Sequence, residues 1–247
     1  MIPIRARSTS FDLDSPPPLP ERVVDAWRRR GPRYVWHKAL RRGLRRWPSW
    51  RRRILYRNPR SYWNLRGGHD YFREQEGQPG RARRAEWLAD RIARYAPDSV
   101  LEIGCGYGKQ LRELRGRLPA AALVGVDFSP SQLDYAQEYL DDLDGLSLLL
   151  GDGQRLPFPD SSFDLVLTSA VILHNAPEVA DRIRREAIRV ARRWVAHNED
   201  TDRTYNRFGY DTAAWYRQAG IRLAEVGPIP VGPADEVARS QFCVAAL

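Results

Sequence analysis

The stretch from Val100 to Gly108 constrains the fold of this 247-residue chain more than any other segment; it reads Val-Leu-Glu-Ile-Gly-Cys-Gly-Tyr-Gly. An apolar run leads straight into glycines at alternate positions, and Leu111, Leu114 and Leu118 follow at helical spacing. Glycine lets the backbone turn sharply and lets a ligand approach where a Cβ atom would collide. Because the amides at the start of the following helix would face that ligand, the stretch predicts a buried strand, a tight turn and a helix around a binding site.

An acidic residue narrows the choice of ligand. Glu102 lies two residues before the first glycine, where a carboxylate does nothing for a pyrophosphate but attracts a ligand that carries an ammonium and a sulfonium. The stretch therefore resembles the glycine-rich motif of class I S-adenosylmethionine (SAM) dependent methyltransferases, in which an acidic residue precedes Gly-x-Gly-x-Gly. The resemblance implies that SAM is the cofactor and that these residues bind it: Glu102, Gly104, Cys105, Gly106 and Gly108.

The next apolar segment, residues 122–128, ends in Asp127 and Phe128. A carboxylate at the carboxyl end of the second strand can accept both hydroxyls of a ribose. The same spacing occurs in NAD-binding folds, so it does not separate the two cofactors by itself. We place Asp127 and Phe128 in the cofactor site, and Ser129 and Pro130 then start a helix as its N-cap and first residue.

A third strand is expected over residues 146–150, and it runs into Gly151-Asp152-Gly153. From the residues alone this is a plain turn. The resemblance implies that Asp152 bonds the adenine amino group and that the backbone amide of Gly153 contacts the ring.

The fourth strand is introduced by residues 156–164, which read Leu-Pro-Phe-Pro-Asp-Ser-Ser-Phe-Asp. This phrase before an apolar strand is typical of small-molecule methyltransferases of the same class. Ser169, at the end of that strand, completes the expected set of cofactor-binding residues. The motifs occur in the order and at the distances that the family shows. Together they therefore indicate the family far more specifically than any single motif does.

The rest of the chain predicts alternating strands and helices, with further strands at residues 194–198, 221–226 and 241–247. The total is seven strands with intervening helices, so the expected fold class is α/β, a Rossmann-like doubly wound sheet. The resemblance to class I methyltransferases implies that the last strand is antiparallel. We divide the chain into residues 1–60, a proline-rich lead-in with an arginine-rich helical extension; residues 61–95, an N-terminal lid and helix; and residues 96–247, the methyltransferase domain.

Positive charge is concentrated near the N-terminus. The whole chain has a formal net charge of +9, whereas residues 22–60 hold fourteen arginines and Lys38 against the single acid Asp25, a local net charge of +14. Residues 1–20 precede this segment and are rich in proline, which predicts an extended lead-in. The basic character therefore belongs to an extension and not to the catalytic body.

An apolar stripe runs through the same extension. Trp36, Leu40, Leu44 and Trp47 recur at helical spacing, and Pro48 is expected to end the helix. One interpretation is an amphipathic helix that lies on an anionic membrane surface or another polyanion. The other is a cap whose stripe packs on the body and whose arginines face solvent, and both stay open.

Aromatic residues and glycines crowd together over residues 61–75, before a helix expected at 79–95. In the methyltransferases that the chain resembles, a similar Tyr-Trp segment folds over the cofactor. The resemblance implies that Tyr62, Trp63, Arg66 and Tyr71 cover the cofactor, with Tyr62 and Arg66 in contact with SAM. A hydrophobic staple between the extension and the body is the alternative.

Methyl transfer to a hydroxyl needs an aligned acceptor and a base that removes the proton. His174 follows the fourth strand and Glu199 follows the fifth, at the edge of the sheet where ligands bind in such folds, so both are candidate catalytic residues. A structural role for a lone loop histidine stays open. No ligand spacing calls for a metal, and we assign none.

Other features bear on substrate class and location. The chain has no Asn/Asp-Pro-Pro-aromatic run after the fourth strand, which argues against methylation of an amino group on a base or on glutamine. Cys105 and Cys243, the two cysteines, look like buried thiols, as in a reducing cytoplasm. We see no secretory signal or membrane span, so we expect a cytoplasmic protein that the basic extension can hold at the inner membrane face.

These signals predict a SAM-dependent methyltransferase. Its resemblance to enzymes of polysaccharide, glycolipid and secondary-metabolite pathways makes O-methylation of a sugar hydroxyl in a saccharide, glycolipid or natural product the first hypothesis. C- or N-methylation of a small metabolite or quinone-like lipid is the alternative, and a non-catalytic SAM-fold module that binds nucleic acid or membrane is a third. Nucleic acid is the less favoured partner because no RNA-binding motif accompanies the extension, and no residue pattern indicates an oligomeric state. Glu102 disfavours a dinucleotide oxidoreductase.

Overall fold

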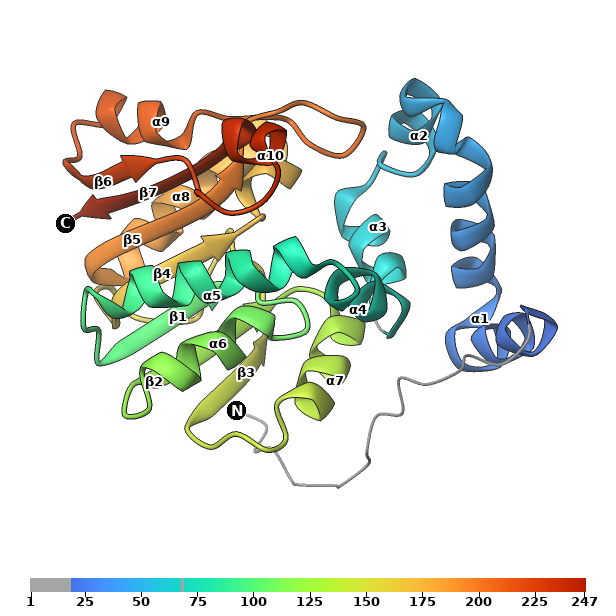
Figure 1. Ribbon diagram of the computed structural model, residues 1–247, viewed down its shortest axis with the longest axis horizontal. Coiled ribbons are helices and arrows are strands. Elements are labelled where there is room, and N and C mark those ends of the chain that lie inside the picture. The colour runs from blue at the N-terminus through green and yellow to red at the C-terminus, as the bar shows by residue number, and fades with distance from the viewer. Residues whose placement is uncertain (1–18, 68) are drawn as a thin grey trace.

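The computed structural model describes residues 19–67 and 69–247, which fold around a seven-stranded sheet in the order β3-β2-β1-β4-β5-β7-β6 (Figure 1). The strands are β1 (Ser99–Ile103), β2 (Ala122–Asp127), β3 (Leu146–Leu150), β4 (Phe163–Ser169), β5 (Ala191–Asp200), β6 (Leu223–Gly227) and β7 (Ser240–Ala246). All neighbours pair in parallel except β7, which is antiparallel to both β5 and β6. The predicted α/β fold with an antiparallel last strand is confirmed.

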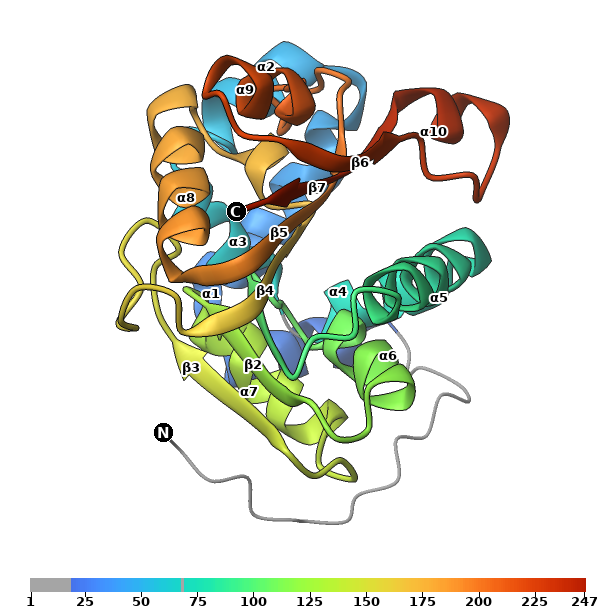
Figure 2. The same cartoon turned by 90° about the vertical axis from the view of Figure 1, so that its left-hand side faces the viewer.

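Helices cover both faces of the sheet and extend beyond its edge (Figures 1 and 2). They are α1 (Leu19–Gly43), α2 (Pro48–Ile54), α3 (Pro59–Arg66), α4 (His69–Glu76), α5 (Pro79–Ala93), α6 (Lys109–Arg117), α7 (Pro130–Tyr139), α8 (Pro177–Val190), α9 (Thr212–Gln218) and α10 (Ala234–Arg239), with 3-10 turns η1 (Leu44–Arg46) and η2 (Ile172–His174). In Figure 2, α5 and α6 lie on one face and α8 and α9 on the other.

The two layers follow from the alternation of side chains along each strand. Val100 of β1 packs in a buried cluster with residues of α5, α6 and α7, whereas the next residue, Leu101, packs in a second cluster with α8 and α9. Leu165 and Val166 of β4 divide between the same two clusters. Because the central strands are covered on both faces, they are almost continuously apolar, as the sequence shows.

The N-terminal extension differs from its expected form. α1 begins at Leu19, well before Trp36, the first residue of the apolar stripe, and is kinked at Gly31, whose φ of 78° lies in the left-handed region. Pro48, which is expected only to end a helix, is also the first residue of α2. Its missing amide hydrogen costs nothing at that position. The lead-in predicted for residues 1–20 lies almost wholly outside the described residues.

Most of the apolar stripe of the extension faces solvent, whereas Leu44 packs against the buried cluster of Leu55, Tyr56 and Tyr62. Trp36 is 65% exposed and Trp47 is 57% exposed, and Leu40 lies on the surface between them. The packed side of α1 instead carries Tyr34 and His37, which are buried. The interpretation in which the stripe packs on the body is therefore wrong for Trp36, Leu40 and Trp47 and holds for Leu44 alone, because α1 turns a different face inward.

Two other sequence expectations can be compared with the described residues. Cys105 and Cys243 are both buried free thiols, as predicted. Within residues 19–67 and 69–247, no helix combines the length and the apolar character that crossing a bilayer requires.

A buried histidine makes the stability of the fold depend on pH. His197 of β5 is fully buried, where Nδ1 lies 2.7 Å from Thr168 Oγ1 and Nε2 lies 2.8 Å from Tyr216 Oη. Burial, helped by the charge of Arg184, lowers the pKa of His197 from 6.5 to about 3. The unfolded chain therefore binds this proton more readily, so the stabilisation is complete above pH 6.5 and is lost as the pH falls below that value.

We expect His197→Gln to destabilise the protein at neutral pH, because the buried hydrogen bonds are weakened. The difference in free energy of unfolding between wild type and variant should then shrink by about 1.4 kcal/mol per pH unit as the pH falls below 6.5, since only the wild type pays the protonation cost. Urea unfolding at a series of pH values measures this difference. A difference that stays constant with pH would show that His197 does not titrate in the unfolded chain as argued.

Candidate active site

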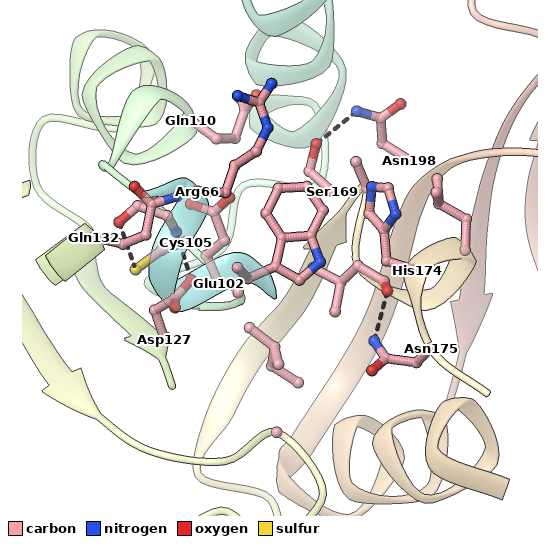
Figure 3. Close-up of a pocket in the computed structure, with 18 of the residues that line it drawn as sticks. Arg66, Glu102, Cys105, Gln110, Asp127, Gln132, Ser169, His174, Asn175 and Asn198 are labelled. Atoms are coloured by element: carbon pink, nitrogen blue, oxygen red, sulfur yellow. Dashed lines mark hydrogen bonds between the residues drawn. The ribbon is translucent and has the colours of Figure 1, made fainter. Parts of the chain in front are cut away.

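A pocket of about 410 Å³ opens at the carboxyl ends of β1, β2 and β4 and is covered by α3. Figure 3 shows Glu102, Cys105 and Asp127 gathered at one end, and His174, Asn175 and Asn198 at the other. All the predicted cofactor-binding residues line this pocket except Gly108: Tyr62, Arg66, Glu102, Gly104, Cys105, Gly106, Asp127, Phe128, Asp152, Gly153 and Ser169. The sequence motifs therefore converge on one site.

The glycine turn forms the floor of the pocket, and its three glycines have different reasons for being there. A Cβ on Gly104 would meet Val171 at 2.5 Å, and one on Gly108 would meet Leu140 at 2.5 Å, so both positions are fixed by close packing. A Cβ on Gly106 would meet nothing nearer than 3.5 Å. Because Gly106 faces open pocket, its missing side chain leaves room for a ligand.

Glu102 supplies a buried carboxylate that lacks a hydrogen-bond partner on one oxygen in the part of the chain that the structure describes. It is 3% exposed, and its Oε2 atom has no hydrogen-bond partner among the described residues. Burial, and then the nearby charge of Asp127, raises the pKa of Glu102 well above its ordinary value. A buried acceptor without a partner is costly, and a cationic ligand group in the pocket would satisfy it.

Asp127 ties the glycine turn to the end of β2. Its Oδ2 accepts a hydrogen bond from the amide of Gly106 at 2.9 Å, and its Oδ1 accepts one from the amide of Ser129 at 2.8 Å. Burial raises the pKa of Asp127 to about 6, although these backbone hydrogen bonds oppose the shift. The carboxylate lines the pocket next to Phe128.

The third strand brings Asp152 to the same edge. Its carboxylate accepts hydrogen bonds from the amide and side chain of Gln154 and lies 3.2 Å from Arg60 of α3. The Arg60 guanidinium also lies over the ring of Phe128, 5.4 Å from its centroid. Arg60 therefore joins the covering helix to both residues at this end of the pocket.

α3 covers the pocket because its aromatic residues pack into the body. Tyr62 is 1% exposed, and its hydroxyl lies 2.8 Å from that of Tyr205. Arg66 is paired with Glu74 of α4 at 2.8 Å, and Trp63 lies with its ring centroid 4.7 Å from that of His174. Because Tyr62, Trp63 and Arg66 also line the pocket, the segment is both a lid and a packed link to the extension.

His174 lies at the far end of the pocket, at the end of η2. Its Nδ1 is 2.7 Å from the carbonyl oxygen of Asn206. Because a carbonyl only accepts, Nδ1 carries the hydrogen and Nε2 keeps its lone pair. Burial lowers the pKa of His174 from 6.5 to about 4, so the ring is neutral at pH 7.

Glu199 lies elsewhere than expected. It is 1% exposed, does not line the pocket, and accepts hydrogen bonds from Thr168 Oγ1 and from the amides of Val171, Ile172 and Leu173. Both oxygens are thus engaged in fixing the turn that carries His174. The geometry does not bring Glu199 to an acceptor.

Residues 100–194 match the methyltransferase domain family. A demethylmenaquinone methyltransferase of Roseiflexus is 37% identical over 110 residues, covering 43% of this chain and 45% of that protein. A sterol 24-C-methyltransferase of Neurospora crassa is 35% identical over 101 residues, covering 40% and 26%. The chain spans less than half the length of these relatives.

Residues 100–194 therefore form a class I SAM-dependent methyltransferase domain. Among solved structures, magnesium protoporphyrin IX methyltransferase from Synechocystis, crystallised with SAM, has a TM-score of 0.57 at 16% identity, covering 85% of this chain and 96% of that one. The cyclase SpnF has a TM-score of 0.51 at 19% identity, covering 65% and 80%. These likenesses concern the fold alone, so the chemistry of the methyltransferase domain must be argued from its pocket.

Two features of the methyltransferase domain fit the chemistry of SAM. The unpartnered Oε2 of Glu102 offers a buried acceptor to the ammonium group, and the open space at Gly106 offers room beside backbone amides. For metals, no group of three or more His, Cys, Asp or Glu that could hold an ion occurs in the parts of the chain that the structure describes.

Sequence reasoning missed a polar network beside His174. Arg84 of α5 donates to Asn198 Oδ1 at 2.8 Å and to Asp200 Oδ1 at 2.9 Å, and Asp200 also pairs with Arg207 at 3.0 Å. All four residues line the pocket. The alternation along β5 could have found Asn198 and Asp200, because they share one face of the strand whereas Glu199 lies on the other. Arg84 and Arg207 come from other segments, and no local pattern points to them.

We expect Glu102→Gln to weaken SAM binding by about tenfold or more, because the charge-assisted hydrogen bond to the ammonium group is lost. Isothermal titration calorimetry with SAM measures the change. Glu225→Gln, on the distant strand β6, is the matched control and should keep wild-type affinity, since Glu225 pairs with Arg91 outside the pocket. Equal affinity of Glu102→Gln and wild type would exclude the ammonium contact.

Proposed function

We propose that the chain transfers the methyl group of SAM to a hydroxyl on a small-molecule acceptor, with a sugar hydroxyl of a saccharide, glycolipid or natural product as the first candidate. The observation that carries this proposal is the state of His174 in the pocket. Its Nδ1 is fixed by the Asn206 carbonyl, and its Nε2 makes no hydrogen bond within the described residues. A neutral imidazole with a free lone pair is what a general base for hydroxyl deprotonation needs.

The cofactor is assigned to the end of the pocket opposite His174. When bound, SAM supplies an electrophilic methyl group. Glu102 would hold its ammonium group, Asp127 its ribose hydroxyls, and Asp152 with the amide of Gly153 its adenine. Tyr62 and Arg66 would cover it from α3.

The acceptor is assigned to the space between His174 and the polar network of β5. Asn198, Asp200 and Arg84 present amide, carboxylate and guanidinium groups there, and these groups hydrogen-bond readily to hydroxyls. A polyhydroxylated acceptor could thus be aligned with one hydroxyl toward His174 Nε2. Positioning of this kind accounts for much of the rate of an in-line displacement.

Glu199 has a supporting role in this proposal. Because its carboxylate accepts the amides of the turn before His174, it holds the imidazole in place without touching the acceptor. It is a positioning residue and not the base.

C-methylation of a quinone-like or sterol-like lipid is the second candidate. It is favoured by the names of the relatives, which include demethylmenaquinone and sterol 24-C-methyltransferases. A carbon acceptor that is already nucleophilic needs no strong base. The two candidates therefore differ in how much they depend on His174.

We expect His174→Gln to slow methyl transfer by about a hundredfold or more, because a positioned base of this kind contributes that much. The rate is measured as incorporation of labelled methyl from SAM into fractions of a cell extract, with mass spectrometry of the labelled product. Glu225→Gln, a change on β6 outside the pocket lining, is the control and should leave the rate unchanged.

Three outcomes separate the alternatives. A slow His174→Gln with unchanged SAM affinity and a methylated hydroxyl in the product supports the O-methyltransferase. An undiminished rate would remove His174 as the base and favour the lipid C-methyltransferase. SAM binding without any transfer of label would favour the non-catalytic module.

A further inference from the structure

The N-terminal arm, residues 19–57, exposes large apolar side chains that a soluble surface does not usually carry together. Trp27 is 51% exposed, Trp50 is 55% exposed and Ile54 is 47% exposed. With Trp36 and Trp47, four of these five are tryptophans, the residue most suited to the boundary between water and lipid. Large apolar side chains exposed at this density along one arm indicate a surface that has a partner.

The exposure is built into the way in which α1 packs. Tyr34 and His37 face α3, where the His37 ring lies 5.3 Å from that of Tyr62. Trp36 lies roughly opposite Tyr34 on the same helix and about 100° from His37, and Leu40 follows Trp36 after one helical turn. The apolar face is therefore held outward by a packed inner face, and Figure 1 shows the arm at the edge of the molecule farthest from β6.

Positive charge surrounds the apolar face. Residues 19–57 hold thirteen arginines and Lys38 against Glu21 and Asp25, a net charge of +12. Among the described residues, Arg33, Arg42, Arg45 and Arg46 make no ion pair with a carboxylate. These cations are free to meet anionic groups of a partner.

The combination selects one partner. A second copy of the chain would bring two strongly positive arms together, and the repulsion would oppose association. A nucleic acid would satisfy the arginines but would not require exposed Trp36 and Trp47. An anionic lipid bilayer accepts both, since phosphates meet the arginines and the acyl boundary receives the indole rings.

The arm is also joined to the pocket. Arg51 of α2 donates to Tyr205 Oη at 3.1 Å, and Arg52 donates to the carbonyl of Thr204 at 3.1 Å. Tyr205 lines the pocket and contacts Tyr62 of α3. A surface bound by the arm would thus lie beside the elements that cover the acceptor.

We propose that the N-terminal arm docks the protein on an anionic bilayer and that the acceptor is an amphiphile taken from it. The second half of this statement rests on the proposed methyltransferase function, whereas the docking does not. Lipid binding is therefore measured separately from SAM binding.

The test is co-sedimentation of the full chain with phosphatidylcholine vesicles, with and without phosphatidylglycerol. The wild type should bind the phosphatidylglycerol vesicles selectively. The double variant Trp36→Gln/Trp47→Gln and the double variant Arg42→Glu/Arg46→Glu should each bind at least about tenfold more weakly. Val226→Gln, at a 41% exposed apolar position on β6, is the matched control and should bind as the wild type does.

Each variant is also titrated with SAM by calorimetry, which shows whether its pocket is still folded. Unchanged SAM affinity with lost vesicle binding supports the proposal. Wild-type protein that ignores phosphatidylglycerol vesicles, or variants that bind them as well as the wild type, would overturn it. If the wild type does not bind vesicles but dimerises, and the tryptophan variant does not, the arm is a dimer interface. If the wild type instead binds nucleic acid and the tryptophan variant does not, the arm is a nucleic-acid interface. Failure of the wild type to bind SAM would instead overturn the proposed function and leave the docking result standing.

Discussion

The hydrogen bonds that Asp127 accepts from the backbone amides of Gly106 and Ser129 hold the pocket together. They join the turn after β1 to the start of α7, so that the carboxyl ends of β1 and β2 form one wall. The close packing of Gly104 on Val171 joins the same turn to the segment after β4. Three strand ends are thus fixed around one space, and the position of every other site residue depends on this arrangement.

The fold could be predicted from the sequence because its signals are local. The apolar strand before Gly104, the Ser129-Pro130 helix start and the spacing of later segments each depend on neighbouring residues alone. They are sufficient to predict seven strands, whereas the antiparallel direction of the last strand is implied by the resemblance to class I methyltransferases. The position of β7 between β5 and β6 could not be read from spacing, since it follows from the resemblance and not from any local pattern.

The site was predictable where a motif carries it and not where packing decides it. Glu102, Asp127 and Asp152 converge on the pocket as expected. Glu199 was misplaced because adjacent residues of a strand point to opposite faces, and a carboxylate at the end of a strand can be used by the protein's own amides. The stripe on α1 was visible in the sequence, but the side chosen for burial depended on His37 meeting Tyr62, a contact between distant segments.

The unpartnered carboxylate of Glu102 has a consequence for the protein outside catalysis. A buried group that only a ligand can satisfy destabilises the free protein relative to the bound one. Any ligand that binds the folded chain alone shifts the unfolding equilibrium in proportion to the logarithm of its concentration. The resistance of this protein to heat or proteolysis should therefore rise with the concentration of the ligand that satisfies Glu102, so that scarcity of that ligand shortens the survival of the folded chain.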